Sequence, residues 1–242
     1  MLWRADRDPN IDRIAANGLR YGQWHTTALC SPTRSCLLTG RNHTTNGMAC
    51  ISEAAVGFPG ANGHIPPEGA TLAEILVEQG FSTAMVGKWH LCAEDEMNLA
   101  STKRNWPIGR GFERFYGFLG AETSQWYPDL VHDNHPVEQP ATPEEGYHFG
   151  VDITDRALEY FGDVKAIAPD RPVFLYYAPR MCARSAPGAE GVDRPVSGQL
   201  RRWVRGDARG DPGPPEGDGS DTARHRIARA QSDRRPRNTQ RP

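Results

Sequence analysis

Two helical patterns along the chain are each followed directly by a short apolar run. Residues 71–80 predict a helix capped by Thr71, and the run FSTAMVGKWHL at 81–91 predicts a strand that passes into a loop. Residues 151–166 predict an amphipathic helix, and RPVFLYYAP at 171–179 predicts a buried strand. Helices that alternate with short apolar strands indicate an α/β fold with a mostly parallel central sheet.

This fold class directs attention to the carboxyl ends of strands. Open α/β sheets bind their ligands in the crevice beyond those ends. Two segments of the chain meet the condition, namely Gly87–Leu91 and the residues that follow Pro179. We expect chemistry at these two places.

The other local patterns predict less regular structure. Residues 8–16 predict a helix that ends at Asn17-Gly18, residues 19–24 predict a short strand, and residues 101–150 are largely irregular. Within the helix at 151–166, five apolar side chains are expected to face inward: Val151, Ala157, Leu158, Phe161 and Val164.

The chain changes in composition near residue 180. Residues 1–179 have the aromatic and aliphatic runs of a globular region, whereas residues 180–242 contain no Lys, Phe or Tyr and are rich in Arg, Gly, Pro and Asp. Such a segment buries too little apolar surface to offset the entropy of ordering, so we expect disorder. A nucleic-acid-binding arm is an alternative, but acidic residues are interspersed and no aromatics interleave. A frame-shifted translation of a GC-rich gene is the interpretation we favour.

The location of the protein is predicted from what its sequence lacks. The N-terminus MLWRADRDPN has no apolar signal region, and no stretch approaches the roughly 20 apolar residues of a membrane span. The five cysteines are an odd number without a tight framework, which argues against a disulfide scaffold. We expect a soluble cytoplasmic protein with no membrane or nucleic-acid partner.

Cys30 lies just before a predicted helix. Ser31 is a good N-cap, Pro32 suits the first helical position, and Gly40 ends the helix. A helix N-terminus favours anions and activates thiols, and Arg34, one turn in, adds a cation. The alternative is a buried structural cysteine before a capped helix.

The order of residues around Cys30 is more specific. The run CSPTRS at 30–35, followed by LTGR at 38–41, resembles the signature of the sulfatase family, and GKWHL at 87–91 resembles that family's second motif. The segment GRGFERFYGFLGAETSQWYPDL at 109–130 resembles the bacterial arylsulfatase branch. The resemblance covers about residues 8–179 and implies an alkaline-phosphatase-like sulfatase fold.

The resemblance implies that Cys30 does not remain a cysteine. In the family, a separate formylglycine-generating enzyme oxidises this residue to formylglycine (3-oxoalanine), whose aldehyde hydrates to a diol. One hydroxyl attacks the sulfur of a sulfate ester, and the other then expels sulfate, which is nucleophilic catalysis in two steps. A thiol has no second hydroxyl and could not regenerate in this way.

Three further residues take catalytic roles from the resemblance. Arg34 would hold the formylglycine hydrate and neutralise sulfate oxygens, and Lys88 would act as a point charge for the sulfate. His90 would orient the diol or handle its protons. Taken alone, Lys88 and His90 are better explained as a solvated lysine and a packed histidine, and the motif at 30–41 upstream reverses that preference.

The chain departs from the family in its metal ligands. Sulfatases hold a divalent metal, commonly calcium, with hard oxygen ligands. Asp6 and Asp8 follow no apolar strand, so only the formylglycine of Cys30 is carried over as a ligand. The family's histidine after the strand at 171–179 is also missing, and His225 is too distant to replace it.

These departures lead to an expectation about the chain as given. Residues 1–179 would be the N-terminal part of a truncated sulfatase domain, with open strand edges. We expect this 242-residue chain to fold poorly and to be inactive even with Cys30 converted.

Other candidates have weaker support. The run HDNH at 132–135 matches no standard zinc spacing and is expected to be a loop near the substrate entrance. Aromatic side chains could line an ester pocket or belong to the core: Trp106, Trp126 and Tyr127. Three cysteines are expected to be small buried hydrophobic residues: Cys36, Cys50 and Cys92.

The sequence thus predicts the lineage of a sulfuric ester hydrolase that cleaves sulfate esters, with aryl esters the expected substrates. Two alternatives stay open. One is a phosphonate or phosphate monoester hydrolase of the same superfamily, since the two kinds of site differ mainly in charge balance. The other is a non-enzymatic remnant.

Overall fold

The computed structural model of the protein describes residues 9–179. The tail at 180–242, together with Asp6, Asp8, Cys182 and His225, lies outside the described residues, so the predictions for it stay predictions. The chain divides into two compact units, of which one contains residues 1–22 and the other spans residues 23–186.

The first unit contributes one described helix. Helix α1 (Pro9–Ala16) ends where Asn17 donates its backbone N–H to the carbonyl of Ile14 at 3.1 Å, as predicted. The strand predicted at residues 19–24 is wrong, because this segment pairs with no strand within residues 9–179. Its apolar residues therefore gain no ladder hydrogen bonds.

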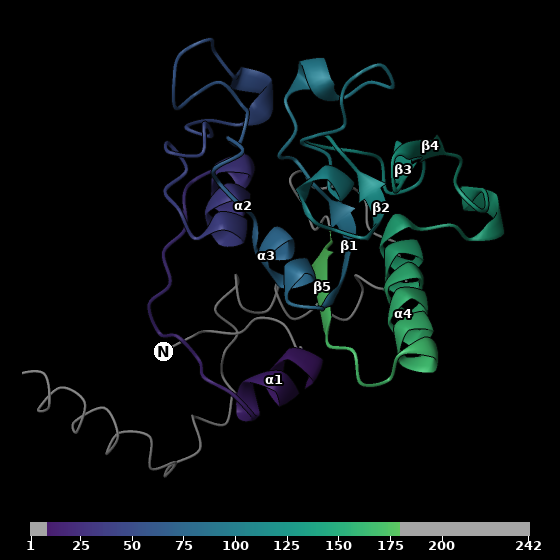
Figure 1. The fold of residues 1–242 in the computed structure, drawn as a ribbon. Helices are drawn as coiled ribbons and strands as arrows, with labels where there is room; N and C mark the ends of the chain where they lie inside the picture. Colours follow the sequence, from purple (N-terminus) through teal and green to yellow (C-terminus); the bar gives the residue numbers. More distant parts are fainter. Residues whose placement is uncertain (1–8, 180–242) are drawn as a thin grey trace, which may run out of the picture. The chain divides into compact units, whose positions relative to one another are not determined.

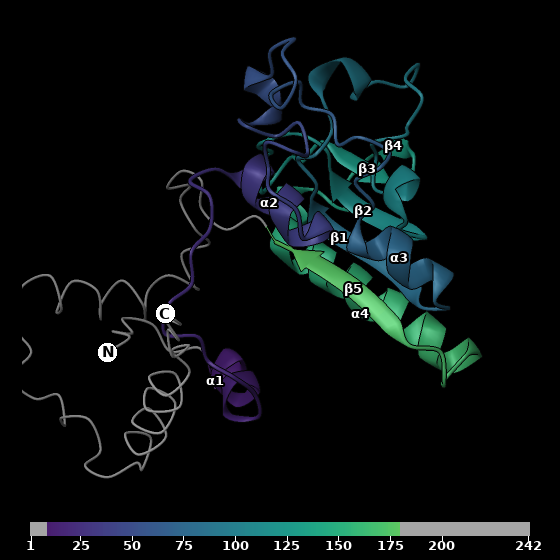
Figure 2. The same ribbon diagram turned by 60° about the vertical axis from the view of Figure 1, so that its left-hand side comes forward.

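The second unit contains a five-stranded mixed sheet in the order β4-β3-β2-β1-β5. Its strands are β1 (Ser82–Lys88), β2 (Arg114–Phe118), β3 (Leu130–His132), β4 (His135–Val137) and β5 (Val173–Ala178). The strands β5, β1 and β2 are mutually parallel, whereas β3 and β4 form an antiparallel hairpin beside β2. The predicted parallel core is confirmed, and residues 101–150 are largely irregular as predicted, with the short strands β2, β3 and β4 within them. β5 forms one edge of the sheet (Figure 2).

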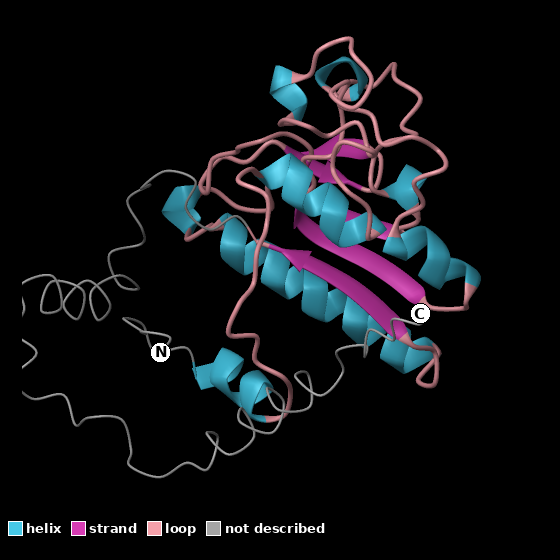
Figure 3. Ribbon diagram, turned by 90° about the vertical axis from the view of Figure 1, so that its left-hand side faces the viewer, coloured by secondary structure: helices cyan, strands magenta, loops and turns pink. Residues whose placement is uncertain are grey.

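Helices cover both faces of this sheet. Helices α2 (Cys30–Thr39) and α3 (Leu72–Glu78) lie on one face, and α4 (Phe149–Ile167) lies on the other (Figures 1 and 3). Thr71 caps α3 in a capping box with Glu74, as expected from the sequence. Because both faces are covered, every residue of β1 is buried.

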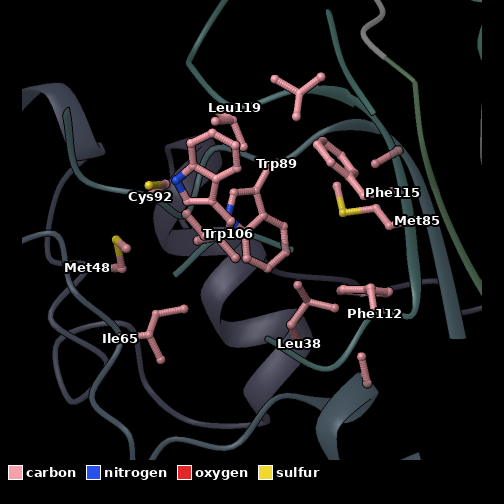
Figure 4. Close-up of a cluster of buried hydrophobic side chains, with 14 residues drawn as sticks. Leu38, Met48, Ile65, Met85, Trp89, Cys92, Trp106, Phe112, Phe115 and Leu119 are labelled. Carbon is pink, nitrogen blue, oxygen red and sulfur yellow. The ribbon is translucent and has the colours of Figure 1, made fainter. Parts of the chain in front are cut away.

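Alternate residues of β1 point into two different cores. Met85 joins Trp89 and Leu38 in the cluster on the α2 and α3 face (Figure 4). Ala84 and Val86 join the cluster that packs against α4. The two clusters fix the strand from both sides, so the residue at its carboxyl end is held in place.

The buried face of α4 differs from the prediction. The helix buries Phe149, Ile153, Ala157 and Tyr160, whereas Val151, Leu158 and Phe161 are exposed. Asp152 explains the choice of face, because its carboxylate accepts hydrogen bonds from the hydroxyls of Tyr116 at 2.7 Å and Tyr147 at 2.9 Å. Of the five side chains predicted to face inward, only Ala157 is buried, because these hydrogen bonds turn the face with Asp152 toward the sheet.

Within residues 9–179, no helix has both the length and the apolar character needed to cross a lipid bilayer.

Candidate active site

The carboxyl ends of the parallel strands meet at one edge of the sheet. Lys88 ends β1 opposite Phe118, the last residue of β2, and Gly87 lies opposite Ala178, which ends β5. Gly87 has φ +98°, and a Cβ atom there would lie 2.1 Å from the carbonyl oxygen of Ala178. Only glycine allows the backbone to pass this closely.

Helix α2 brings Cys30 to this edge. Cys30 is its first residue, and Leu29 is the N-cap without a side-chain hydrogen bond. The prediction of Ser31 as N-cap is therefore wrong, and Cys30 lies within the first turn instead of before it. Ser31 is instead buried, where its hydroxyl accepts a hydrogen bond from the Ser52 backbone N–H at 3.4 Å.

Arg34 connects α2 to two strands. Its Nη1 donates to the backbone carbonyl of Lys88 at 2.6 Å and to the hydroxyl of Tyr176 at 3.3 Å. Tyr176 stands on β5, so one guanidinium group ties α2 to the ends of β1 and β5. Its remaining N–H donors leave capacity for an anion, since guanidinium has five.

Lys88 is a buried cation beside Cys30. Its side chain is 7 % exposed, and Nζ donates to the carbonyl of Ala121 at 2.5 Å. Burial lowers the pKa of Lys88, a hydrogen bond with the neighbouring Cys30 sulfur opposes this, and the charge of Arg34 lowers it further. Two cations held this close together favour an anion between or beside them.

His90 is fully buried two residues later. Its backbone is left-handed, with φ 57°, a conformation that costs a non-glycine residue roughly 1–2 kcal/mol. Between the two, Trp89 packs edge-on against Phe112 and donates its indole N–H to the carbonyl of Asn105 at 2.8 Å. The anchored indole fixes the backbone from which Lys88 and His90 project.

His90 contacts a carboxylate that lies in neither sequence motif. Glu53 stands on the short helix η1 (Ser52–Ala54), and its Oε2 lies 2.7 Å from His90 Nε2. Burial lowers the pKa of His90, and Lys88 and Arg34 act in the same direction, while Glu53 opposes them. The Nδ1 atom of His90 is buried and has no hydrogen-bond partner within the described residues.

The structure thus brings Cys30, Arg34 and Lys88 together at this edge, and His90 follows two residues after Lys88. Their catalytic roles stay predictions. The alternative of a solvated Lys88 is wrong, because the side chain is buried. Sequence reasoning missed Tyr176 and also Glu53, which lies on the short helix η1 in a segment without periodicity. Tyr176 could have been found from the sequence, because it lies in a predicted strand whose carboxyl end was expected at the site.

The weaker candidates lie elsewhere. His132 and His135 flank the turn between β3 and β4, where Asp133 accepts a hydrogen bond from the backbone N–H of Phe115 at 2.8 Å. Phe115 lies three residues before Phe118, which is roughly 10 Å along the strand. The prediction of a loop near the substrate entrance is therefore wrong, because this turn lies toward the amino end of β2.

The aromatic and cysteine candidates include both buried and partly exposed side chains. Trp106 belongs to the buried core, whereas Trp126 packs on His148 and Tyr127 is exposed. Cys92 is buried, and burial raises the pKa of its thiol to about 12, which suits a structural role. Two cysteines are only half-buried and correct the prediction: Cys36 and Cys50.

Within residues 9–179, no group of three or more His, Cys, Asp or Glu side chains is arranged to hold a metal ion. Glu53, whose charge acts on Lys88, is committed to His90. Calcium takes 6–8 oxygen ligands. The described residues therefore do not supply its donor set.

Comparison with known proteins identifies the family of this chain. The sulfatase family model matches residues 5–182, which contain both motifs. The chain belongs to the sulfatase family.

Among characterised sulfatases, human arylsulfatase A is 32 % identical over 198 residues, which cover 70 % of this chain and 35 % of the human protein. Human steryl-sulfatase is 40 % identical over 114 residues, covering 46 % of this chain and 19 % of that protein. The chain thus spans about a third of the length of arylsulfatase A and less of steryl-sulfatase.

Solved structures show the same fold. A putative sulfatase from Bacteroides fragilis has a TM-score of 0.58 at 19 % identity and covers 88 % of this chain and 46 % of that one. A Bacteroides thetaiotaomicron protein from a locus for glycosaminoglycan metabolism has a TM-score of 0.55 at 20 % identity, covering 82 % of this chain and 52 % of that one. The predicted alkaline-phosphatase-like sulfatase fold is confirmed. The assignment to a bacterial arylsulfatase branch stays a prediction.

Proposed function

We propose that the lineage of this chain hydrolyses sulfate esters, with aryl esters the expected substrates, through a formylglycine derived from Cys30. The observation that supports this most strongly is the convergence of Cys30, Arg34 and Lys88 at one sheet edge. A thiol in the first turn of a helix, beside two cations, is a site for an anionic group.

Arg34 and Lys88 would bind the sulfate group. Arg34 is held in place by Lys88 O and Tyr176, so its free N–H donors are already oriented before substrate arrives. Lys88 would present a compact positive charge. Burial makes that charge unfavourable, and a bound anion would offset this free-energy cost. Both groups would stabilise charge on the sulfate oxygens in the transition state without rearranging.

Cys30 and His90 would supply the reacting groups. When the aldehyde is present and hydrated, it provides one hydroxyl that attacks sulfur and a second that releases sulfate. His90 would hold or move a proton at this diol, because burial and the nearby cations keep its ring neutral near pH 7. The half-buried position of Cys30 leaves its side chain accessible to substrate.

Family membership implies a divalent metal, and we propose calcium because it prefers hard oxygen ligands. Within residues 9–179, no group of side chains forms its site. The formylglycine-generating enzyme as a partner and a cytoplasmic location remain parts of this proposal.

The first test is on the 242-residue chain itself. It is expressed with a formylglycine-generating enzyme, and the tryptic peptide spanning residues 21–34 is examined by mass spectrometry. We expect an aldehyde in place of the Cys30 thiol. An unmodified thiol, in a host where a control sulfatase is converted, would contradict the proposal.

The second test measures turnover by the protein expressed from the complete locus, which means the gene for this chain together with its flanking sequence. We expect hydrolysis of 4-nitrophenyl sulfate in preference to 4-nitrophenyl phosphate and to a phosphonate monoester. Cys30→Ala should lower the rate by roughly 1000-fold or more, whereas Cys36→Ala, which removes a thiol from the same helix, should leave it unchanged. Preference for the phosphorus esters would favour the related monoester hydrolases.

A further inference from the structure

Glu53 and His90 form an isolated buried pair behind the proposed site. The Oε2 atom of Glu53 and the Nε2 atom of His90 are 2.7 Å apart, and the histidine side chain is fully buried while that of Glu53 is 26 % exposed. A separation this short is typical of a charge-assisted hydrogen bond. The sequence motifs explain His90 but not its partner.

The protonation of Glu53 decides which ring nitrogen carries the proton. Burial by itself would raise the pKa of Glu53, but hydrogen bonds from His90, from the backbone and from Ser52 hold it below its ordinary value of 4.5. An ionised carboxylate can only accept hydrogen bonds, so the bond must come from an N–H at Nε2 of His90.

The remaining nitrogen of His90 is then an acceptor. Burial and the charges of Lys88 and Arg34 keep the ring neutral near pH 7. A neutral imidazole with its proton on Nε2 has its lone pair on Nδ1. That atom is buried and has no partner within residues 9–179, which is costly unless a ligand or a reacting group supplies a donor.

The backbone of His90 adds to the same arrangement. Its N–H donates to the carbonyl of Leu119 at 2.9 Å while φ is 57°. Strained conformations of this kind cost about 1–3 kcal/mol and persist where surrounding contacts over-determine them. Glu53 is the side-chain contact that fixes the rotation of the ring.

We propose that Glu53 is a positioning residue that holds the proton of His90 on Nε2 and so leaves Nδ1 as the acceptor for a donor on a ligand or reacting group at the site. This inference rests on the proposed function. Glu53 acts through His90 and does not itself touch the reacting atoms.

The test is side-chain ¹H–¹⁵N NMR of the protein expressed from the complete locus, with the His90 signals assigned from a His90→Gln variant. In the wild type we expect a downfield Nε2–H signal that exchanges slowly with water, and an Nδ1 shift typical of an unprotonated nitrogen. Glu53→Gln keeps the shape and removes the charge, so the signal should move upfield and its exchange should quicken roughly tenfold.

Glu94→Gln is the matched control. Glu94 lines the same cavity of about 340 Å³ as Glu53, but its charge is not among those that act on His90. Its spectrum should be that of the wild type. A wild-type proton on Nδ1, or a signal that is unchanged in Glu53→Gln, overturns the inference. If Glu53→Ala does not fold, the isosteric Gln variant still decides.

An activity measurement separates this inference from the proposed function. In formylglycine-bearing enzyme from the complete locus, Glu53→Gln should lower kcat with little change in KM. Turnover by the wild type with no effect of Glu53→Gln on kcat overturns the inference and leaves the function standing. No turnover by the wild type overturns the function, while the NMR signature still decides the role of Glu53.

Discussion

The two ends of the three parallel strands are built differently. At the amino ends, Arg171 pairs with Glu113 at 3.1 Å and donates to the carbonyls of Gly80 at 3.2 Å and Phe81 at 3.1 Å. Glu113 in turn accepts from the backbone N–H of Thr83 at 3.1 Å. Each charge there has an opposite charge or a dipole beside it, and both ionic side chains are partly exposed.

At the carboxyl ends, Lys88 and Arg34 have a carbonyl or hydroxyl dipole beside them but, within residues 9–179, no carboxylate at ion-pair distance. Lys88 is buried near Arg34, and its pKa is lowered first by burial and also by the like charge. His90 is buried in a strained conformation with one ring nitrogen unpartnered within residues 9–179. The difference indicates that the amino ends contribute to stability, whereas the carboxyl ends are arranged for an anion that binds later.

The largest expected effect concerns the backbone at the carboxyl ends. Gly87→Ala should destabilise the fold by about 3–4 kcal/mol, because the new Cβ would lie 2.1 Å from Ala178 O and φ is +98°. Urea unfolding followed by tryptophan fluorescence measures this change.

Gly80→Ala is the control at the amino ends. Gly80 also has a positive φ, of +84°, but a Cβ atom there would meet nothing within 4 Å. It should cost only about 1 kcal/mol. Equal losses for the two variants would show that the close approach of the strands is not what Gly87 permits.

An intermediate effect is expected for the buried cation. Lys88→Met keeps the apolar stem and removes the ammonium group, so binding of inorganic sulfate should weaken about 10- to 100-fold. The stability should change by less than about 1 kcal/mol, since the lost hydrogen bond to Ala121 is offset by removal of a buried charge. Calorimetric titration and thermal unfolding measure the two quantities. Lower stability with unchanged sulfate affinity would show that Lys88 contributes to stability and not to anion binding.

The smallest effect is expected at the amino ends. Arg171→Ala should destabilise the fold by about 0.5–1 kcal/mol, because the ion pair with Glu113 is partly exposed, and sulfate affinity should not change. Arg171→Lys should recover part of the loss. A change in sulfate binding in either variant would show that the two ends are not independent.

Much of the fold follows from local sequence patterns. The capping box at Thr71 and the start of the helix after residue 148 are fixed by contacts within a few residues, and the strand at 82–88 lies within a short apolar run. β2 and the β3–β4 hairpin were missed, because their short strands are defined by pairing with β1 and with each other and not by a periodic pattern. The buried face of α4 likewise depends on a polar contact between distant residues.

The candidate site likewise contains residues that local motifs predict and a residue that only a long-range contact reveals. Cys30, Arg34, Lys88 and His90 lie in two continuous motifs, so their residue types and spacing were informative. The contact of Glu53 with His90 spans 37 positions in the sequence and joins the short helix η1 to the segment that follows β1. Nothing in the residues around Glu53 marks it as different from a solvated glutamate.

The contact between Arg34 and Tyr176 has a consequence for biosynthesis. The two residues are 142 positions apart, and ribosomes add about 5–20 residues per second. Between roughly 7 and 30 s therefore pass after Arg34 is made before its partner on β5 exists. During that interval Cys30 is part of a nascent chain whose parallel sheet cannot yet close around it. An enzyme that modifies Cys30 has this window of time, which the length of the intervening chain sets.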